Sequence, residues 1–496
     1  MDAVEGLRPE EKPGLPPLLR RIPADTCIYV VLVLVLVAFS VFVLIEVYSV
    51  DGLFSYDPYY HMHLSELMER EGDLVTEIQF YETEEAPQYV SSMRSLTALI
   101  HEYTGISYLN IYKGFGLFCR IFTALALFIT AAYFLRSKKY ALIAVILFLS
   151  SPYIIYRSFI TFPENLVMPF HILIFYSLIK SLREKKADHI LPVLIAASLY
   201  IHYRSIIVPA VLVLVFLLFW RRIRYTVGLL ASMAILAAPI LVSAVEQYVA
   251  YLQVNVGPSA AWKPYTVADP SYTVPTLSGY QSQLGALLLL FSLLGIPFLI
   301  RKINAQKFLL LVWLVFTFAL TRGKAIGLYV PPDRMLAYLC MPAALTAAVF
   351  FKEIVGLEVL TSRARYVFVA AVTVVLIFFL FVNLPSVHGW VGVGADELNT
   401  SEWLNDNVSQ DAVILPFDLD LITIGLESYK NVDGLSYGDW TEIFSHPLGV
   451  KDRLRQLYPD KRIYIVTGNK VFSLHDAEIV FSEGDMRVYT YWDEGT

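Results

Sequence analysis

The first polar string that could do chemistry reads Ser-Tyr-Asp-Pro-Tyr-Tyr-His-Met-His and contains Asp57. Its proline disfavours helix before it and can begin one after it, so we expect Asp57 to cap a helix N-terminus. Asp57, His61 and Glu66 are expected to share one face of that helix, with His63 offset from it. The string would equally suit a structural cap followed by aromatic residues of the membrane interface, so by itself it leaves both interpretations open.

The second polar string, Tyr-Arg-Ser-Phe-Ile-Thr-Phe-Pro-Glu-Asn, ends with Glu164 and Asn165. Its proline predicts a helix start, which places both residues in the first turn. A first-turn Glu is favoured by the helix dipole alone, and this is the structural alternative to a role in a site. If Asp57 lies nearby, the two carboxylates could hold a divalent cation, or one of them could act as a general base.

A third group of candidate residues is cationic and borders two later connections between apolar segments. His202 and Arg204 fall in a short turn, and Asp333 and Arg334 open a later helix. Because the planar guanidinium group of arginine can donate two parallel hydrogen bonds to phosphate oxygens, we expect Arg204 and Arg334 to bind phosphate. For Arg322, at the end of another apolar segment, contact with lipid headgroups is the preferred interpretation.

Composition restricts the class of protein that must position these residues. Of the 496 residues, 57% are hydrophobic and 17% are charged, and the mean hydropathy is +0.58. Soluble domains are nearer a quarter charged, so we predict a polytopic membrane protein. The composition excludes a coiled coil, a collagen, a disordered chain and a disulfide scaffold. The isolated cysteines Cys27, Cys119 and Cys340 form no pair with metal-ligand spacing.

Eleven apolar segments approach the length of about 20 residues that a membrane-spanning helix needs. The predicted spans are residues 27–48, 114–135, 140–158, 165–181, 189–203, 206–220, 226–245, 283–300, 307–321, 334–351 and 366–385. With eleven spans and a cytoplasmic N-terminus, every cluster of Lys and Arg falls on the cytoplasmic side, as the positive-inside rule requires. Arg120 and His171 lie within spans, where burial with hydrogen-bonded partners is the preferred interpretation.

The predicted domain organisation follows from this topology. Residues 1–26 form a cytoplasmic tail, and residues 27–385 form a transmembrane domain with long outer loops at 49–113 and 246–282. Residues 386–496 contain a helical pattern and short alternating runs typical of strands, which predict an extracytoplasmic α/β domain. The first outer loop is acidic, which suits either solvated surface or cation binding.

Four strings in this order resemble the motifs of GT-C membrane glycosyltransferases, particularly the archaeal branch related to oligosaccharyltransferase catalytic subunits. SYDPYYHMH resembles the first acidic motif of that superfamily, and YRSFITFPENL resembles the second. PPDRMLAYLCMP resembles the Asp-Arg segment that opens a late helix. SEWLNDNVSQDAVIL resembles the run that starts the outer C-terminal domain.

The resemblance implies an inverting transfer of a sugar from a polyprenyl-phosphate or polyprenyl-diphosphate carrier. It makes Asp57 and Glu164 the catalytic carboxylates, and the same two residues would ligate Mg or Mn if a divalent cation is required. It implies that Arg334 and Arg204 hold the donor phosphate. The substrate-binding residues expected around these carboxylates are Tyr59, His61, His63, Asn165, Arg204, Asp333 and Arg334.

A departure from the oligosaccharyltransferase pattern favours a transferase of single sugars. The acceptor-reading Trp-Trp-Asp-Tyr-Gly string of those subunits has no equivalent in order or position; the nearest string runs from Ser436 to Trp440. The expected partners are a polyprenyl-phosphate-linked sugar, a glycan, lipid or protein acceptor and membrane lipid, with no nucleic acid. Protein N-glycosylation is one alternative, and a non-catalytic membrane scaffold or a transporter is another.

Overall fold

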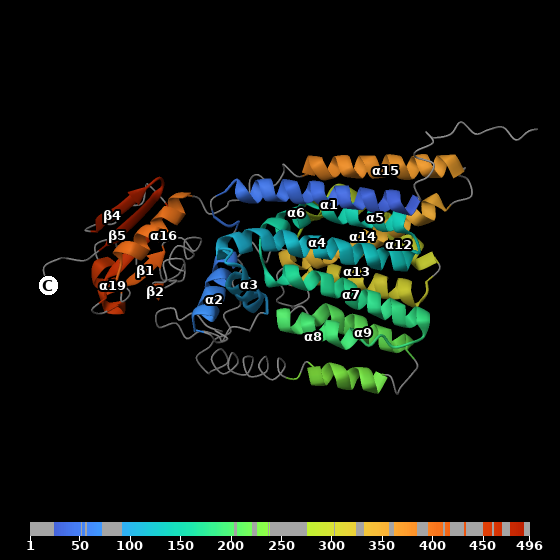
Figure 1. Ribbon diagram of the computed structural model, residues 1–496, viewed down its shortest axis with the longest axis horizontal. Coiled ribbons are helices and arrows are strands. Elements are labelled where there is room, and N and C mark those ends of the chain that lie inside the picture. The colour runs from blue at the N-terminus through green and yellow to red at the C-terminus, as the bar shows by residue number, and fades with distance from the viewer. Residues whose placement is uncertain are drawn as a thin grey trace, which may run out of the picture.

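The computed structural model is predominantly helical. It describes residues 24–50, 52–54, 57–71, 92–202, 206–220, 226–236, 238, 275–301, 303–323, 332–356, 362–383, 395–409, 412–416, 431–432, 450–458, 461–468 and 477–490. Most of the predicted outer loop 246–282 lies outside these residues. Within them, the helices of the bundle lie roughly side by side, and a small sheet lies at the opposite end of the molecule (Figure 1).

Each apolar segment that the sequence predicts as a span contains a helix. The helices are α1 (Ala24–Tyr48), α4 (Tyr108–Leu135), α5 (Lys138–Leu149), α6 (Pro152–Phe159), α7 (Pro163–Glu184), α8 (Leu191–Ile201), α9 (Ile207–Phe219), α11 (Leu277–Leu284), α12 (Ala286–Arg301), α13 (Ala305–Leu320), α14 (Pro332–Val355) and α15 (Ser362–Asn383). A further apolar helix covers Thr226–Leu236. The predicted helical membrane fold is therefore confirmed.

Within the described residues, four to six spans meet the length and hydropathy of a membrane crossing, against the eleven predicted. Among the described residues, α1, α4, α7 and α14 are each long and apolar enough to cross a membrane. Two bent pairs raise that number to six if each pair is one span: α5 with α6, at 68°, and α11 with α12, at 109°. The remaining apolar helices that this test recognises have 10–17 residues, so the predicted total stays a prediction.

Helix α5 is central because it is apolar on every side. All residues from Tyr140 to Leu149 are buried, and the helix packs against α1, α4, α14 and α15. A helix that is hydrophobic all round belongs in a protein core or in lipid. Cys119 and Cys340 are also fully buried in the bundle, whereas Cys27 near the start of α1 is exposed.

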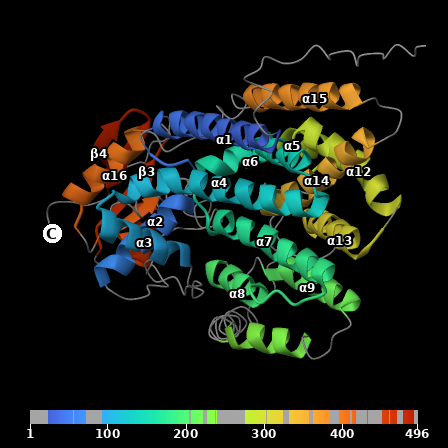
Figure 2. The same cartoon turned by 45° about the vertical axis from the view of Figure 1, so that its right-hand side comes forward.

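Two short helices, α2 (Asp57–Glu71) and α3 (Ser92–Thr104), lie between the bundle and the sheet (Figure 1). Both lie beside one end of α4 (Figure 2). Buried hydroxyls join these two helices to α4. The Ser65 hydroxyl lies 2.9 Å from the hydroxyls of Thr97 and Tyr112. Tyr108 donates a hydrogen bond of 2.5 Å to Glu69. These contacts fix α2, which carries the first polar string, against the end of the bundle.

The described residues of the C-terminal unit, within 395–490, form a five-stranded sheet and two helices. The strands are β1 (Val413–Pro416), β2 (Asn431–Val432), β3 (Ile463–Thr467), β4 (Glu478–Glu483) and β5 (Met486–Thr490), and the helices are α16 (Ala395–Asn407) and α19 (Val450–Leu457). The strand order is β2-β1-β3-β5-β4. β1 pairs in parallel with β2 and β3, and β5 pairs antiparallel with β3 and β4. The predicted C-terminal α/β structure is present.

Candidate active site

An ion pair joins the second polar string to the Asp-Arg segment. The Nη1 atom of Arg334 donates to Oε1 of Glu164 at 2.7 Å, and Nε2 of His202 lies 3.6 Å from the same oxygen. The side chain of Glu164 is only 4% exposed, whereas that of Arg334 is 35% exposed. One side of the guanidinium is therefore held by a buried carboxylate while the group remains accessible from solvent.

Local sequence explains why these groups meet. Pro163 occupies the first turn of α7 and places Glu164 beside the unpaired backbone N–H groups of that turn. Arg334 lies in the first turn of α14, which begins at Pro332. A cation is unfavourable at a helix N-terminus, so the Glu164 carboxylate compensates the Arg334 charge where the two helix starts converge.

Helix α2 contributes His61 to the same region. Nε of Arg94 donates to Nδ1 of His61 at 3.0 Å, so the ring accepts at this nitrogen. Burial lowers the pKa of His61 well below its ordinary value, and the positive charge of Arg94 lowers it further. The negative charge of Glu164 opposes these effects, while Arg334 and His202 add to them. His61 is therefore a neutral imidazole within electrostatic reach of the Glu164–Arg334 pair.

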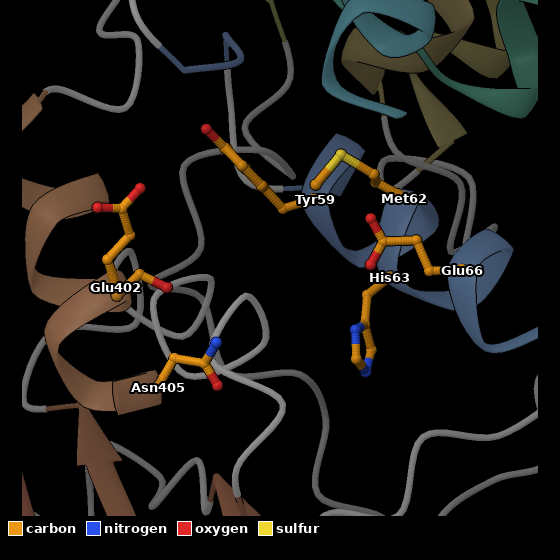
Figure 3. A pocket seen from close by; sticks show the side chains of 7 residues that line it. Tyr59, Met62, His63, Glu66, Glu402 and Asn405 are labelled. Carbon is orange, nitrogen blue, oxygen red and sulfur yellow. The ribbon is translucent and has the colours of Figure 1, made fainter. Parts of the chain in front are cut away.

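The opposite face of α2 borders a cavity of about 210 Å³ beside α16 (Figure 3). The lining residues are Tyr59, Met62, His63, Glu66, Ser401, Glu402 and Asn405. In Figure 3 the side chains of Glu402 and Asn405 lie across the open space from those of α2. Carboxylates, an amide, an imidazole and an aromatic ring thus surround one cavity.

The expectation that Glu66 shares a face with Asp57 and His61 is wrong. Nine residues separate Glu66 from Asp57, which is about 900° at roughly 100° per residue and so half a turn out of phase. Glu66 lines the cavity with His63 instead. Burial raises the pKa of Glu66 to about 7 and lowers the pKa of His63 to about 4.

Asn165, an expected substrate-binding residue, makes hydrogen bonds to other parts of the chain. It is fully buried, and its Nδ2 donates to the carbonyl oxygens of Arg157, at 2.9 Å, and Ile160, at 2.5 Å. Its Oδ1 accepts from Nη2 of Arg120 at 3.1 Å. The hydrogen-bonded burial expected for Arg120 is therefore confirmed. His171 instead stacks on a tyrosine ring, and within the described residues neither of its ring nitrogens has a hydrogen-bond partner.

The side chains of three expected site residues lie outside the described part of the structure. Arg204 lies outside the described residues, and only the backbone of Asp57 and Asp333 is described. Helix α2 nevertheless begins at Asp57, as the proline predicts. Tyr59 is buried, and its hydroxyl accepts from the backbone N–H of Leu53 at 2.9 Å.

The residues described around Glu164 do not match a divalent-cation site. Hard cations bind several oxygen ligands, whereas the neighbours of this carboxylate are Arg334 and His202. The described part of the chain contains no group of three or more His, Cys, Asp or Glu side chains that could hold a metal ion.

Two groups of residues at the candidate site were not predicted from the sequence. Arg94 is fully buried and holds His61; its isolation as a basic residue within an acidic loop was the available signal. Glu402 and Asn405 belong to a segment that was recognised only as the start of a domain, because nothing in the sequence places α16 against α2.

Solved structures share the overall fold of this chain. ArnT from Cupriavidus metallidurans, bound to undecaprenyl phosphate, superposes with a TM-score of 0.64 at 12% identity, over 93% of this chain and 98% of that chain. The archaeal oligosaccharyltransferase AglB from Archaeoglobus fulgidus, in complex with an inhibitory peptide and a dolichol-phosphate, gives 0.59 at 12% identity, over 88% of this chain and 69% of that one.

The chain has a GT-C fold. The arabinofuranosyltransferase AftD from Mycobacteria also superposes, with a TM-score of 0.57 at 13% identity, over 93% of this chain and 40% of that chain. No family model matches the sequence, and no curated protein matches it. Within this GT-C fold, the second polar string and the Asp-Arg segment meet at the Glu164–Arg334 pair. Helix α2, which carries the first polar string, brings His61 within electrostatic reach of that pair.

Proposed function

We propose that this chain is an integral-membrane glycosyltransferase that moves a sugar from a polyprenyl-phosphate or polyprenyl-diphosphate carrier to an acceptor, with inversion, at the outer membrane face. The observation that carries the proposal is the Glu164–Arg334 ion pair beside His61, which unites three sequence motifs in one polar site. The GT-C fold supports the same reaction class, since its solved examples include an undecaprenyl-phosphate complex and a dolichol-phosphate complex.

The chemistry needs one base and one anion-stabilising group. The acceptor oxygen attacks the anomeric carbon and loses its proton, while the bond between that carbon and the carrier phosphate oxygen breaks. The phosphate leaves with the bonding electrons, and a single displacement inverts the configuration. We assign the proton to the Asp57 carboxylate and the developing phosphate charge to the accessible part of the Arg334 guanidinium.

Glu164 is assigned as a positioning residue in this scheme. Its carboxylate already accepts from Arg334 and lies near His202, which makes it a poor second base. Its buried charge fixes the guanidinium and offsets the cost of a cation at the start of α14. His61 is neutral and held by Arg94, so it can donate a hydrogen bond through Nε2 without adding positive charge.

The cavity between α2 and α16 is the proposed acceptor site. Its carboxylates, amide and hydroxyl are suited to the hydroxyl groups of a sugar, and the ring of Tyr59 offers an apolar face. Glu66 and Glu402 would disfavour a strongly anionic acceptor. The cavity lies on the face of α2 opposite His61, so donor and acceptor would approach the helix that begins at Asp57 from different sides.

The test is release of free carrier from purified full-length protein supplied with a panel of polyprenyl-phosphate and polyprenyl-diphosphate sugars. We expect one donor class to yield free carrier and Asp57→Asn to reduce that release at least about 100-fold. Asp406→Asn is the matched control, because Asp406 is an exposed carboxylate of α16.

Equal activity of the Asp57→Asn and wild-type proteins would overturn the proposal, and so would no release from any donor. An added arm supplies a peptide with an Asn-X-Thr sequon. Transfer to that peptide would replace the single-sugar assignment with protein N-glycosylation.

A further inference from the structure

A second cavity, of about 220 Å³, lies among the ends of four helices of the bundle. Each of these elements brings one cation to its wall. Arg136 follows the end of α4, Arg183 lies in the last turn of α7, Lys307 lies in the first turn of α13 and Lys352 lies in the last turn of α14. The cations are separated in sequence and meet only through the fold.

The negative charge that lines this cavity is much smaller than the positive charge. Among the described residues of the lining, Glu353 is the one carboxylate, and its Oε1 lies 3.6 Å from Nζ of Lys307. Within the described residues, no ion-pair or hydrogen-bond partner is found for the side-chain nitrogens of Arg136 or Lys352. The charges of Lys307, Arg136 and Arg183 all repel that of Lys352. An anion in the cavity would relieve this repulsion.

The remaining polar groups of the lining also suit an anion. Asn304 caps α13, and its Oδ1 accepts from the backbone N–H of Lys307 at 2.9 Å. The cap leaves the positive end of the α13 dipole at the cavity. Gln306 accepts from Arg183 at 3.2 Å, which fixes that guanidinium at the wall. Four cations and a helix N-terminus therefore surround one space.

The position of the cavity indicates which anion reaches it. Helices α7 and α14 begin at the Glu164–Arg334 pair and end at this cavity. A helix of 22 residues is about 33 Å long, close to the thickness of the hydrocarbon core. The cavity therefore lies about one hydrocarbon thickness from the candidate active site. With α7 and α14 placed across a bilayer, it would be level with the headgroups of the other leaflet.

The positive-inside rule accounts for cations on this side of the membrane, but it does not require four of them to line one cavity. We propose that this cavity binds a phosphate group, and that its source is the headgroup of an anionic phospholipid in the leaflet opposite the candidate active site. Basic cavities between transmembrane helices at a membrane surface are suited to such headgroups. This site is independent of the proposed transfer reaction.

The test measures how well the full-length protein retains phosphatidylglycerol and, separately, phosphatidylcholine. Native mass spectrometry detects the retained lipid, and thermal unfolding measures the stabilisation that each lipid gives. The cavity variant is Lys307→Gln/Lys352→Gln. The matched control, Lys138→Gln/Lys139→Gln, removes two charges from the N-terminus of α5, outside the cavity. We expect the wild-type and control proteins to retain phosphatidylglycerol at least fivefold better than the cavity variant, with no difference for phosphatidylcholine.

Equal retention by the cavity and control variants would overturn the proposal, because general surface charge would then explain lipid binding. If the double variant does not fold, Arg136→Gln supplies the same comparison from an exposed position. Inorganic diphosphate forms a separate arm. Stabilisation by diphosphate that depends on Lys307 and Lys352, without selective lipid retention, would support the phosphate site and overturn the lipid source.

Discussion

Glu164 and Arg334 are 170 residues apart in sequence, yet their side chains share a hydrogen bond of 2.7 Å. The contact joins the first turns of α7 and α14. It also makes the two groups interdependent, because a buried carboxylate without its cation is costly, and so is a cation at a helix N-terminus without its carboxylate.

We expect Arg334→Gln and Glu164→Gln to reduce turnover by similar factors, on the order of 100-fold, because the first removes the guanidinium and the second removes the carboxylate that fixes it. The double variant should be little worse than either single variant, as expected for residues that act as a unit. A double-mutant cycle on turnover measures this coupling, with Glu102→Gln as the control for an exposed carboxylate of α3. Strictly additive losses would show that the two residues act separately.

Asn165→Ala is expected to destabilise the protein by about 1–3 kcal/mol, because it removes three buried hydrogen bonds, two to backbone carbonyl oxygens and one from Nη2 of Arg120. Activity per folded molecule should change much less. Thermal unfolding and active-fraction measurements separate these effects. A rise in donor KM with unchanged stability would restore Asn165 to the substrate-binding residues.

Gly116 of α4 packs against the backbone that leads to Glu164. A Cβ atom there would lie 2.7 Å from the carbonyl oxygen of Ile160 and 2.8 Å from that of Ser158. We expect Gly116→Ala to displace this backbone and to lower both stability and turnover. Gly114→Ala is the matched control, since its Cβ would meet nothing within 4 Å. Equal thermal midpoints for the two alanine variants would contradict the packing.

Asn405→Ala tests the cavity beside α16. With the donor that releases carrier, we expect the rate of donor hydrolysis in the absence of acceptor to be unchanged. The KM for the acceptor sugar should rise by roughly tenfold, which corresponds to the loss of about one hydrogen bond. Asp406→Ala on the same helix serves as the control. A parallel fall in hydrolysis would assign Asn405 to the donor site instead.

Glu66 and His63 should change the pH dependence of stability in opposite directions. The folded pKa of Glu66 is raised from 4.5 to about 7, so its contribution to stability is lost as pH rises through that window. The folded pKa of His63 is lowered from 6.5 to about 4, so its contribution increases as pH rises. Between pH 4.5 and 6.5, thermal midpoints of Glu66→Gln should therefore rise more steeply with pH than those of wild type, and those of His63→Gln less steeply. Identical slopes would refute both assignments.

Helix positions and helix starts could be predicted from the sequence, because they depend on local chemistry. Apolar segments long enough for helices and the prolines before Glu164 and beside Asp57 were sufficient to predict α7 and α2. The strand-like runs of the C-terminal unit likewise coincide with β1, β3, β4 and β5.

Long-range partners could not be predicted in the same way. Nothing near Asn165 in the sequence reveals that Arg120 occupies its amide oxygen, and nothing near His61 reveals Arg94. The bend between α5 and α6 was also missed, because this pair has the apolar length of one straight span. The bend between α11 and α12 was missed because most of α11 falls within the predicted outer loop 246–282.

The three thiols differ sharply in accessibility, and this difference has a practical consequence. Cys119 and Cys340 are sealed inside the bundle, while Cys27 is exposed near the start of α1. A membrane-impermeant maleimide applied to intact cells and to inverted vesicles would therefore report on a single native position. Because α1 is long enough to cross the bilayer and ends shortly before Asp57, one labelling experiment without engineered cysteines would establish on which side of the membrane the polar site opens.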